Sequence, residues 1–366
     1  MALRIAQVAP PFETVPPAGY GGTERVVSVL TEELVRRGHD VTLFASGDSR
    51  TKANLVPIVP RALWRQDPPT NDFAAHRASL FGKLLQHLDD FDVVHSHLDY
   101  HGLGLAGLCQ APFVATLHGR LDIPNLLATY RAFAELPLVS ISNAQRRPLA
   151  NANWIATVHH GIDLCSFDFS DTPGDYLAFL GRISPDKGLD VAIRVARRAG
   201  RRLIIAARPP LAFADDPEAR CDRAYYEETI KPLLREPGIE LIGEVAGPQK
   251  SALLRGALGL LFPIRWPEPF GLVMPEALAC GTPVVAFREG SVPEVISHGV
   301  TGFVCDLEEE IVAAVDRLPD IDRRRCRLEA EQRFSPSAMA AAYERVYARL
   351  VAEHQPDRRA YALTAD

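Results

Sequence analysis

The chain has 366 residues, of which 47% are hydrophobic and 23% are charged, with a formal net charge of −6 at pH 7. This length predicts two domains with ordinary hydrophobic cores, and the charge balance argues against a broad basic surface for nucleic acid. The six cysteines form no CxxC pair, so they indicate neither a zinc site nor a disulfide framework. Because no apolar run reaches the about 20 residues of a membrane-spanning helix, and the first residues do not resemble a signal peptide, we expect a cytoplasmic protein without a transmembrane segment.

The first half of the chain alternates short apolar runs with amphipathic ones. Period and composition predict strands at 3–9, 40–46, 92–97, 112–119 and 136–142. A helix is expected at 23–38, where apolar residues share one face and a glycine follows. The segment 153–163 ends this half.

The same rhythm restarts in the second half. Strands are expected at 175–183, 202–207, 238–245, 258–263 and 283–287. Helices are expected at 187–199, near 223–235, near 249–256 and at about 336–354. Alternating strands and helices form parallel sheets with right-handed crossovers. We therefore expect an α/β fold of two doubly wound, Rossmann-like domains that face a central cleft.

The linker between the two series is expected at 163–175, which is rich in Asp, Ser, Pro and Gly. The domains are then 1–165 and 166–345, and the sequence leaves open whether the C-terminal helix, about 346–366, packs back on the first domain. In sheets of this kind, ligands bind beyond the carboxyl ends of the strands. Residues that follow strands are therefore the candidates for function.

A glycine-rich segment, "GYGGTER" (19–25), precedes the first expected helix. Gly21 and Gly22 would let the backbone approach a ligand closely, and a helix N-terminus favours anions. The segment is not a dinucleotide fingerprint, because it does not follow the strand directly. A flexible surface loop is an equally good interpretation of these residues alone.

A second motif, "GRISPDKG" (181–188), directly follows a strand. Arg182 offers a planar fork for phosphate oxygens and Lys187 a mobile point charge. A solvated turn is the alternative, but the position after a core strand favours an anion site.

Histidines follow two other strands. His118 lies in "TLHGR" (116–120), and His95 and His97 lie in "HSHLD" (95–99). A metal site would need a third ligand at matching spacing, and none is evident. We therefore interpret His95 and His97 as structural or acceptor-side residues and expect no metal.

The stretch "RWPEPFGLVMPEALACGTPVV" (265–285) holds two glutamates in an otherwise apolar run. Its prolines predict a rigid loop over Glu268–Met274 and a short helix that begins at Pro275. Such a loop and helix start would present N–H groups to an anion, and a carboxylate there can accept hydroxyl hydrogens from a polyol. The alternatives are a solvated loop charge at Glu268 and a first-turn, dipole-stabilising Glu276.

Together, "GGTE", "GRISPDKG" and "EPFGLVMPEALACGTPVV" resemble the retaining nucleotide-sugar glycosyltransferases of family 4, which have the GT-B fold. The resemblance spans nearly the whole chain, from "RIAQVAP" to "TGFVCD" (301–306), and the family's E-x7-E motif matches Glu268 and Glu276. It implies that Glu276 binds the ribose hydroxyls and that Glu268 holds a hydroxyl of the donor sugar. Pro275 departs from the family pattern and should stiffen the loop.

The resemblance also implies the rest of the donor site. Its catalytic residues would be His118, Glu268, Arg182 and Lys187, of which Arg182 and Lys187 bind the diphosphate and His118 lies near the donor sugar. The first domain would contribute a glycine loop, Gly21 and Gly22, that closes over the diphosphate. The remaining donor-binding residues would be Phe270, Gly271, Leu272 and Val273 with Glu276, and Ile242, Gly243, Glu244 and Val245 beside the base.

The implied activity is hexosyl transfer, with retention, from a nucleotide diphosphate sugar to an acceptor hydroxyl, without a cofactor or a metal. A UDP-sugar such as UDP-glucose is favoured over GDP-mannose by its frequency in the family. The expected acceptor lining, 60–80 and 120–131, suits a sugar, a lipid-linked or a phosphorylated acceptor, and it includes Trp64, Arg65, Arg77, Arg120 and Tyr130. A peripheral membrane contact and the oligomeric state stay open. The alternatives are a GT-B epimerase or phosphorylase, or a non-catalytic protein that binds nucleotide sugars.

Overall fold

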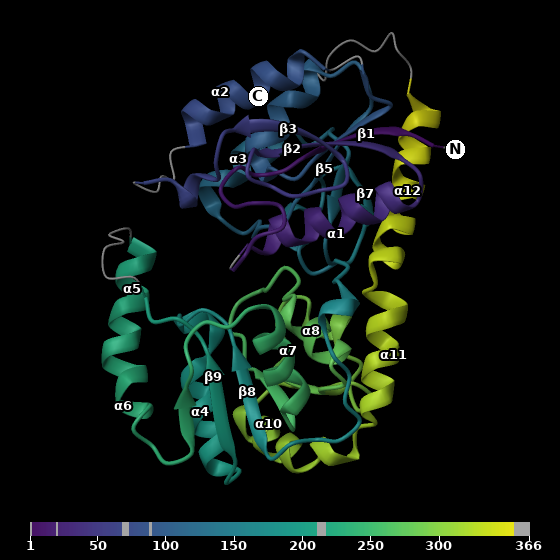
Figure 1. Cartoon of the computed structure of the whole chain (residues 1–366). Helices are drawn as coiled ribbons and strands as arrows, with labels where there is room; N and C mark the ends of the chain where they lie inside the picture. The colour runs from purple at the N-terminus through teal and green to yellow at the C-terminus, as the bar shows by residue number, and fades with distance from the viewer. Residues whose placement is uncertain (1, 20, 68–72, 88–89, 211–216, 355–366) are drawn as a thin grey trace. The chain divides into compact units, whose positions relative to one another are not determined.

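The computed structural model describes residues 2–19, 21–67, 73–87, 90–210 and 217–354. It divides the chain into two compact units (Figure 1). Unit 1 comprises Met1–Ile162 with Pro336–Asp366, and unit 2 comprises Asp163–Ser335. The second boundary therefore lies at Ser335, not at the expected residue 345, because the last helix belongs to unit 1 from its first residue.

Unit 1 is built on a seven-stranded parallel sheet with the order β3-β2-β1-β4-β5-β6-β7. Its strands are β1 (Arg4–Val8), β2 (Asp40–Ser46), β3 (Asn54–Val59), β4 (Val93–Ser96), β5 (Phe113–Thr116), β6 (Leu138–Ser140) and β7 (Trp154–Thr157). The five expected strands are present, while β3 and β7, the two edge strands, were not predicted as strands. Pro57 interrupts the apolar pattern of β3, and the strand tolerates it because β3 lies at the edge of the sheet.

Unit 2 is built on a six-stranded parallel sheet with the order β10-β9-β8-β11-β12-β13. Its strands are β8 (Tyr176–Leu180), β9 (Arg202–Ala206), β10 (Ile239–Leu241), β11 (Gly259–Phe262), β12 (Val284–Phe287) and β13 (Gly302–Cys305). Strands β11 and β13 are buried along their whole length, as in sheets that helices cover on both faces. Two parallel, doubly wound sheets confirm the predicted α/β class.

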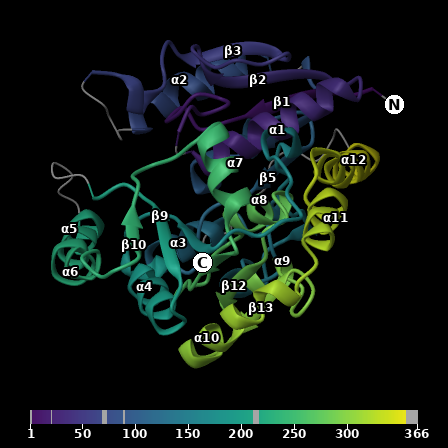
Figure 2. The same cartoon turned by 60° about the horizontal axis from the view of Figure 1, so that its bottom comes forward.

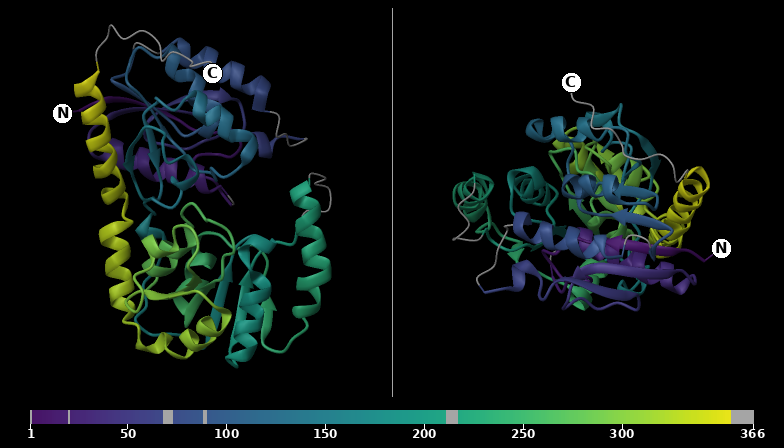
Figure 3. Two further views of the ribbon diagram at one scale, coloured as in Figure 1. Left: turned by 180° about the vertical axis from the view of Figure 1, so that it is seen from behind. Right: turned by 90° about the horizontal axis from the view of Figure 1, so that it is seen from above.

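Helix α12 (Pro336–Glu353) packs against α1 (Gly22–Arg36) and β4 in unit 1. Figure 3 shows the yellow α12 beside this domain from behind. The side chains of Tyr343 and Tyr347 on α12 are fully buried, so the helix is part of the core of unit 1. Unit 1 also contains α2 (Phe73–Leu85) and α3 (Pro124–Ala132). The expected extension of the last helix over 355–366 lies outside the described residues.

The helices of unit 2 are α4 (Leu189–Arg198), α5 (Pro217–Tyr225), α6 (Lys231–Leu233), α7 (Gly247–Gly256), α8 (Val273–Ala279), α9 (Val292–Val295), α10 (Glu308–Asp316) and α11 (Arg323–Arg333). Of these, α4, α7, α8 and α10 contact strands of the sheet, and Figure 2 shows α10 beside β12 and β13. The helix expected near 223–235 is present but begins earlier, as α5, a π-helical turn at Tyr226–Ile230, and α6 in succession. Within the described residues, no helix is both long and apolar enough to span a bilayer.

Helix α8 begins at Val273, two residues before the predicted start at Pro275. The early start is possible because the first N–H groups of a helix have no acceptor within it, so a proline in the first turn removes no bond. Val273 and Met274 are therefore helical, and the irregular loop is shorter than predicted.

Candidate functional site

The backbone of Glu268 lies between β11 and α8 and is held by the segment that follows β12. Ser291 N donates to Glu268 O at 3.0 Å, and Ser291 Oγ donates to Phe270 O at 2.8 Å. Gly290 has φ +52, and a Cβ on it would lie 2.4 Å from both the N and the O of Glu268. Only glycine fits there, so the position of Glu268 depends on this close approach.

The carboxylate of Glu268 meets a cation and an indole. Its Oε2 forms an ion pair with Lys187 Nζ and accepts a hydrogen bond from Trp266 Nε1 at 3.0 Å. The Lys187 ammonium also lies 5.1 Å from the centroid of the Trp266 ring, a favourable cation–π distance. The structure thus brings together Lys187 and Glu268, which were predicted from separate motifs.

Lys187 occupies the short turn after β8 that leads into α4. Gly188 ends this turn with φ +68, and a Cβ on it would lie 2.1 Å from Pro263 O. The turn therefore packs against the residue that directly follows β11. This packing places the motif "GRISPDKG" and the Glu268 loop at neighbouring strand ends, because β8 and β11 are adjacent in the sheet.

Glu276, in the first turns of α8, forms an ion pair with Lys250 of α7 at 2.6 Å. The side chains are only 5% and 15% exposed, and the ammonium lies 5.4 Å from the ring centroid of Phe167. Sequence reasoning missed Lys250, although "GPQK" opens the helix that follows β10. An ion pair this buried fixes the Glu276 carboxylate, because an unpaired charge there would be strongly destabilising.

Arg182 is held by acidic side chains of α5. Its guanidinium lies 2.6 Å from Glu218 Oε1 and 3.5 Å from Asp222 Oδ2. Neither acidic residue was predicted as part of the site. The positive charge of Arg182 is therefore balanced by carboxylates of unit 2 in the structure.

The segment expected beside the base follows β10 as an exposed loop. Ile242 donates its N–H to Ile205 O at 3.0 Å, and its side chain is exposed. Gly243 has φ +83, and Glu244 faces Arg208 at 3.7 Å. Val245, half-buried, continues the loop toward α7. The described contacts of the loop are thus with β9 and Arg208.

Gly21 and Gly22 form the start of α1 in unit 1. Gly21 is the N-cap residue with φ 147, and a Cβ on it would lie 2.8 Å from Pro17 Cβ. The glycine is therefore required by the fold of the loop, and Gly22 is the first helical residue. Glu24, in the same turn, is buried, and this desolvation raises the pKa of its carboxyl to about 7.

His118 follows β5, and its backbone and ring are both held by the segment after β4. His118 N donates to Asp99 Oδ1 at 2.6 Å, and His118 Nε2 lies 2.9 Å from His97 Nδ1. Burial lowers the pKa of His118 to about 3, so the ring is neutral at pH 7. His118 Nδ1 is buried without a hydrogen-bond partner among the described residues.

His95 and His97 are buried parts of a hydrogen-bond network, which agrees with the structural interpretation. His97 Nε2 contacts Gln7 Oε1 at 2.7 Å, and His95 Nδ1 contacts Tyr347 OH at 2.7 Å. Burial lowers the pKa of both histidines well below the ordinary value. Across the described part of the chain, no three His, Cys, Asp or Glu side chains are arranged to hold a metal ion.

The expected acceptor residues are largely paired with other residues of unit 1. Arg65 lies 2.8 Å from Glu13, and Arg120 lies 2.7 Å from Asp122. The exposed Trp64 ring contacts Phe12 in a tilted arrangement, with ring centroids 5.5 Å apart. The remaining two residues differ in solvent exposure: Tyr130 is buried, whereas Arg77 on α2 is exposed. Residues 68–72 of the expected lining lie outside the described residues.

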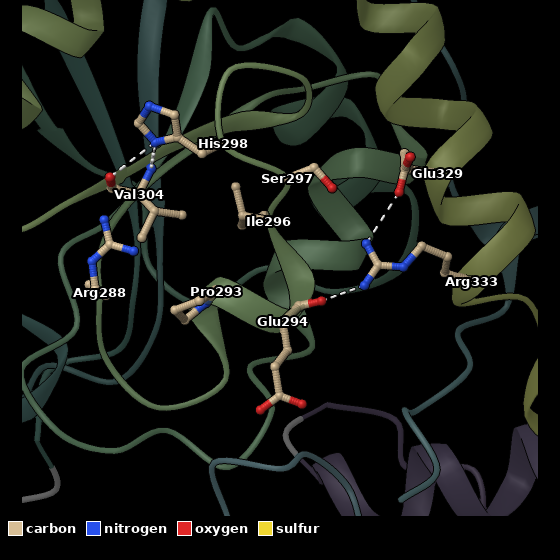
Figure 4. A pocket seen from close by; sticks show the side chains of 9 residues that line it. All are labelled: Arg288, Pro293, Glu294, Ile296, Ser297, His298, Val304, Glu329 and Arg333. Atoms are coloured by element: carbon tan, nitrogen blue, oxygen red, sulfur yellow. Dashed lines mark hydrogen bonds and ion pairs between the residues drawn. The ribbon is translucent and has the colours of Figure 1, made fainter.

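A separate cavity of about 500 Å³ lies in unit 2 between α9, β13 and α11 (Figure 4). Arg333 on its wall pairs with Glu329 at 3.2 Å, and Arg288 pairs with Asp306 at 2.8 Å. None of the predicted site residues lines it. Because these two arginines are already matched by carboxylates, the cavity does not indicate a charged ligand.

Two family models match the chain in succession. The model described as "Glycosyltransferase Family 4" matches residues 20–165, and the one described as "Glycosyl transferases group 1" matches residues 168–334. The match of the first model covers most of unit 1, and that of the second covers nearly all of unit 2.

Named relatives and solved structures are similar over most of the chain. A D-inositol 3-phosphate glycosyltransferase of Mycolicibacterium smegmatis is 29% identical, over 78% of this chain and 75% of the relative. The crystal structure of AviGT4, a glycosyltransferase involved in avilamycin A biosynthesis, has a TM-score of 0.72 at 26% identity and covers 96% of this chain and 99% of its own. A sucrose-phosphate synthase from Thermosynechococcus elongatus shares the fold, with a TM-score of 0.75 at 18% identity over 96% of this chain and 100% of its own.

Proposed function

Since the chain is a family 4 glycosyltransferase with the GT-B fold, we propose that its donor is a UDP-sugar, with UDP-glucose as the first candidate. The hexosyl group would pass to an acceptor hydroxyl with retention of the anomeric configuration. The observation that carries the proposal is the cluster of Lys187, Glu268 and Trp266 at adjacent strand ends of unit 2.

This cluster suits a sugar diphosphate because it offers opposite charges side by side. The leaving group is a nucleoside diphosphate, which needs stabilisation of developing negative charge more than it needs a proton. A bound diphosphate would take the Lys187 ammonium from Glu268. The Glu268 carboxylate, still held by Trp266, would then accept a hydrogen bond from a sugar hydroxyl.

The nucleotide end of the donor would lie at Glu276. Its carboxylate is oriented by Lys250 at 2.6 Å, which leaves oxygen lone pairs for the two ribose hydroxyls. Arg182 would add a second cation at the diphosphate by exchanging Glu218, whose side chain is exposed, for phosphate oxygens.

We propose that transfer needs no metal ion, since Lys187 and Arg182 supply the positive charge that a metal would otherwise provide. Activity should be the same in excess EDTA and after the chelator is removed. Complete loss in EDTA that Mg²⁺ or Mn²⁺ restores would contradict this part of the proposal.

For the acceptor, the names of relatives give the first candidate to test. Those from mycobacteria, 27–29% identical, are named for D-inositol 3-phosphate, so we propose a phosphorylated polyol. Unphosphorylated sugars and lipid-linked acceptors follow in the screen.

The proposal is tested first by thermal shift with UDP, GDP, ADP and their glucose or mannose conjugates. A ligand at 100 times its Kd should stabilise the protein by about 2.7 kcal/mol, and the best donor is then combined with the acceptor panel. Conversion of the donor without acceptor would identify an epimerase, and binding without turnover a non-catalytic protein. If no nucleotide diphosphate raises the Tm, the proposal is wrong.

A further inference from the structure

A chain of hydrogen bonds connects His118 to the C-terminal helix α12 inside unit 1. We call it the histidine chain, and its members lie on or directly after adjacent strands β1, β4 and β5, and on α12. In order, they are His118, His97, Gln7, Tyr347, His95 and Thr116. Of these, His97, Gln7, His95, Thr116 and Tyr347 are buried, at no more than 1% exposure.

Every link of the histidine chain is short. His118 Nε2 lies 2.9 Å from His97 Nδ1, and His97 Nε2 lies 2.7 Å from Gln7 Oε1. Gln7 Nε2 donates to Tyr347 OH at 3.0 Å. The chain continues from Tyr347 OH to His95 Nδ1 at 2.7 Å, and from His95 Nε2 to Thr116 Oγ1 at 2.7 Å.

The Gln7 amide decides the direction of these bonds. Its oxygen can only accept, so His97 must carry its proton on Nε2 and offer the lone pair of Nδ1. His118 must then donate from Nε2, and its own Nδ1 becomes an acceptor. On the other side, the Gln7 amide nitrogen donates to Tyr347 OH, which leaves the phenolic hydrogen for His95. One direction therefore satisfies all the links.

A second contact fixes the backbone of His118. The carboxylate of Asp99 accepts from His118 N at 2.6 Å and from Gly119 N at 3.3 Å. Asp99 has φ +49, and among the described residues it is the one non-glycine residue with a positive φ. Such a backbone conformation persists where the surrounding contacts require it. The segment "HSHLD" thus holds both the ring and the backbone of His118, through His97 and Asp99.

We propose that His97, Gln7 and Tyr347 are positioning residues that hold His118 in the tautomer protonated on Nε2. The unpartnered Nδ1 is then kept as an acceptor for a hydroxyl hydrogen of the donor sugar. This inference rests on the proposed function for its ligand, but the tautomer itself is a property of the protein without ligand. It gives α12 an indirect part in positioning His118, through Tyr347, Gln7 and His97.

The experiment compares Tyr347→Phe with the matched control Tyr343→Phe. Both variants remove one buried phenolic oxygen from α12, but the hydrogen bond of Tyr343 OH among the described residues is to Thr116 Oγ1, at the far end of the histidine chain, at 2.9 Å. In ¹⁵N-histidine-labelled protein, His118 of the wild type and of Tyr343→Phe should show one tautomer, with a pyrrole-type Nε2 and a pyridine-type Nδ1. In Tyr347→Phe the Gln7 amide loses its acceptor, and His118 should show a second, Nδ1-protonated form.

Kinetics with UDP-glucose and the best acceptor give the second readout. Residues that hydrogen-bond to a metal-ligating histidine and orient its ring typically contribute roughly 10- to 100-fold to metal affinity or activity. By analogy, we expect the His97→Phe variant to have a kcat/KM roughly 10- to 100-fold lower than the wild type. His97→Asn, whose side-chain oxygen can replace Nδ1 as acceptor, should recover part of this loss. In a His118→Ala background, His97→Phe should add almost nothing, because coupled residues are not additive.

The outcomes separate this inference from the proposed function. A His118 proton on Nδ1 in the wild type, or equal spectra and equal kcat/KM for the two tyrosine variants, would overturn the inference. Full additivity of His97→Phe and His118→Ala would also overturn it. If no nucleotide sugar is turned over, the proposed function fails, while the tautomers can still be read from the spectra.

Discussion

Replacing Gly290 by alanine tests whether activity depends on the position of Glu268. The new Cβ would lie 2.4 Å from the N and O of Glu268, whereas ordinary contacts begin at 3.4 Å, so one of the two backbones must move by about 1 Å. A displacement of about 1 Å in an enzyme site can lower the rate by roughly 10²-fold. We expect a loss of this size in kcat/KM for UDP-glucose.

Gly299→Ala is the matched control. Gly299 also has a positive φ, +75, but a Cβ on it would meet nothing within 4 Å. Both variants therefore share the left-handed backbone penalty of about 1–2 kcal/mol, and only Gly290→Ala adds the contact with Glu268. The assay measures kcat/KM and Tm for both variants. If the two variants have equal kcat/KM, the activity does not depend on how Gly290 holds Glu268, and the reasoning is refuted.

Three further predictions concern charged side chains. Lys187→Ala should lower kcat by about 10²-fold, the scale of losing one transition-state donor; wild-type turnover in a steady-state assay would contradict its role. Lys250→Met leaves the Glu276 carboxylate unpaired and should cost roughly 3–5 kcal/mol of stability. Lys250→Met with Glu276→Gln should recover most of the lost Tm, and equal Tm values for the single and double variants would argue against the buried pair. The raised pKa of Glu24, about 7 against 4.5, predicts that stability is complete below about pH 4.5 and falls as the pH rises to 7. Glu24→Gln should therefore raise the free energy of unfolding at pH 8 by on the order of 3 kcal/mol, seen as a higher Tm, and the gain should vanish near pH 4. A gain that is independent of pH would exclude this explanation.

The strands and their parallel arrangement were predictable because each core strand is a short run that is apolar on both faces. β8 and β11 illustrate this, since most of their residues are buried and their sequences carry the signal without any knowledge of neighbours. Edge strand β3, with Pro57, carries a weaker signal and was missed. The residues of the donor motifs were identified by their resemblance to a family, and Lys187 and Glu268 indeed lie together.

What the sequence could not supply was the partner of each charged or polar side chain. Lys250 and Glu276 lie on different helices. The carboxylates that hold Arg182 belong to α5, which lies outside the motif "GRISPDKG" that contains Arg182. Local periodicity reports which face of an element is apolar, but it does not report which elements touch.

By itself, the sequence determined two series of strands and helices and the motifs at the strand ends. Only the tertiary structure decided that Gln7 and Tyr347, 340 residues apart, share a hydrogen bond. The reason is the sheet order β1-β4-β5, together with the packing of α12 on β4. These bring the first and last parts of the chain to the same buried polar groups, and no pattern within either segment encodes that contact.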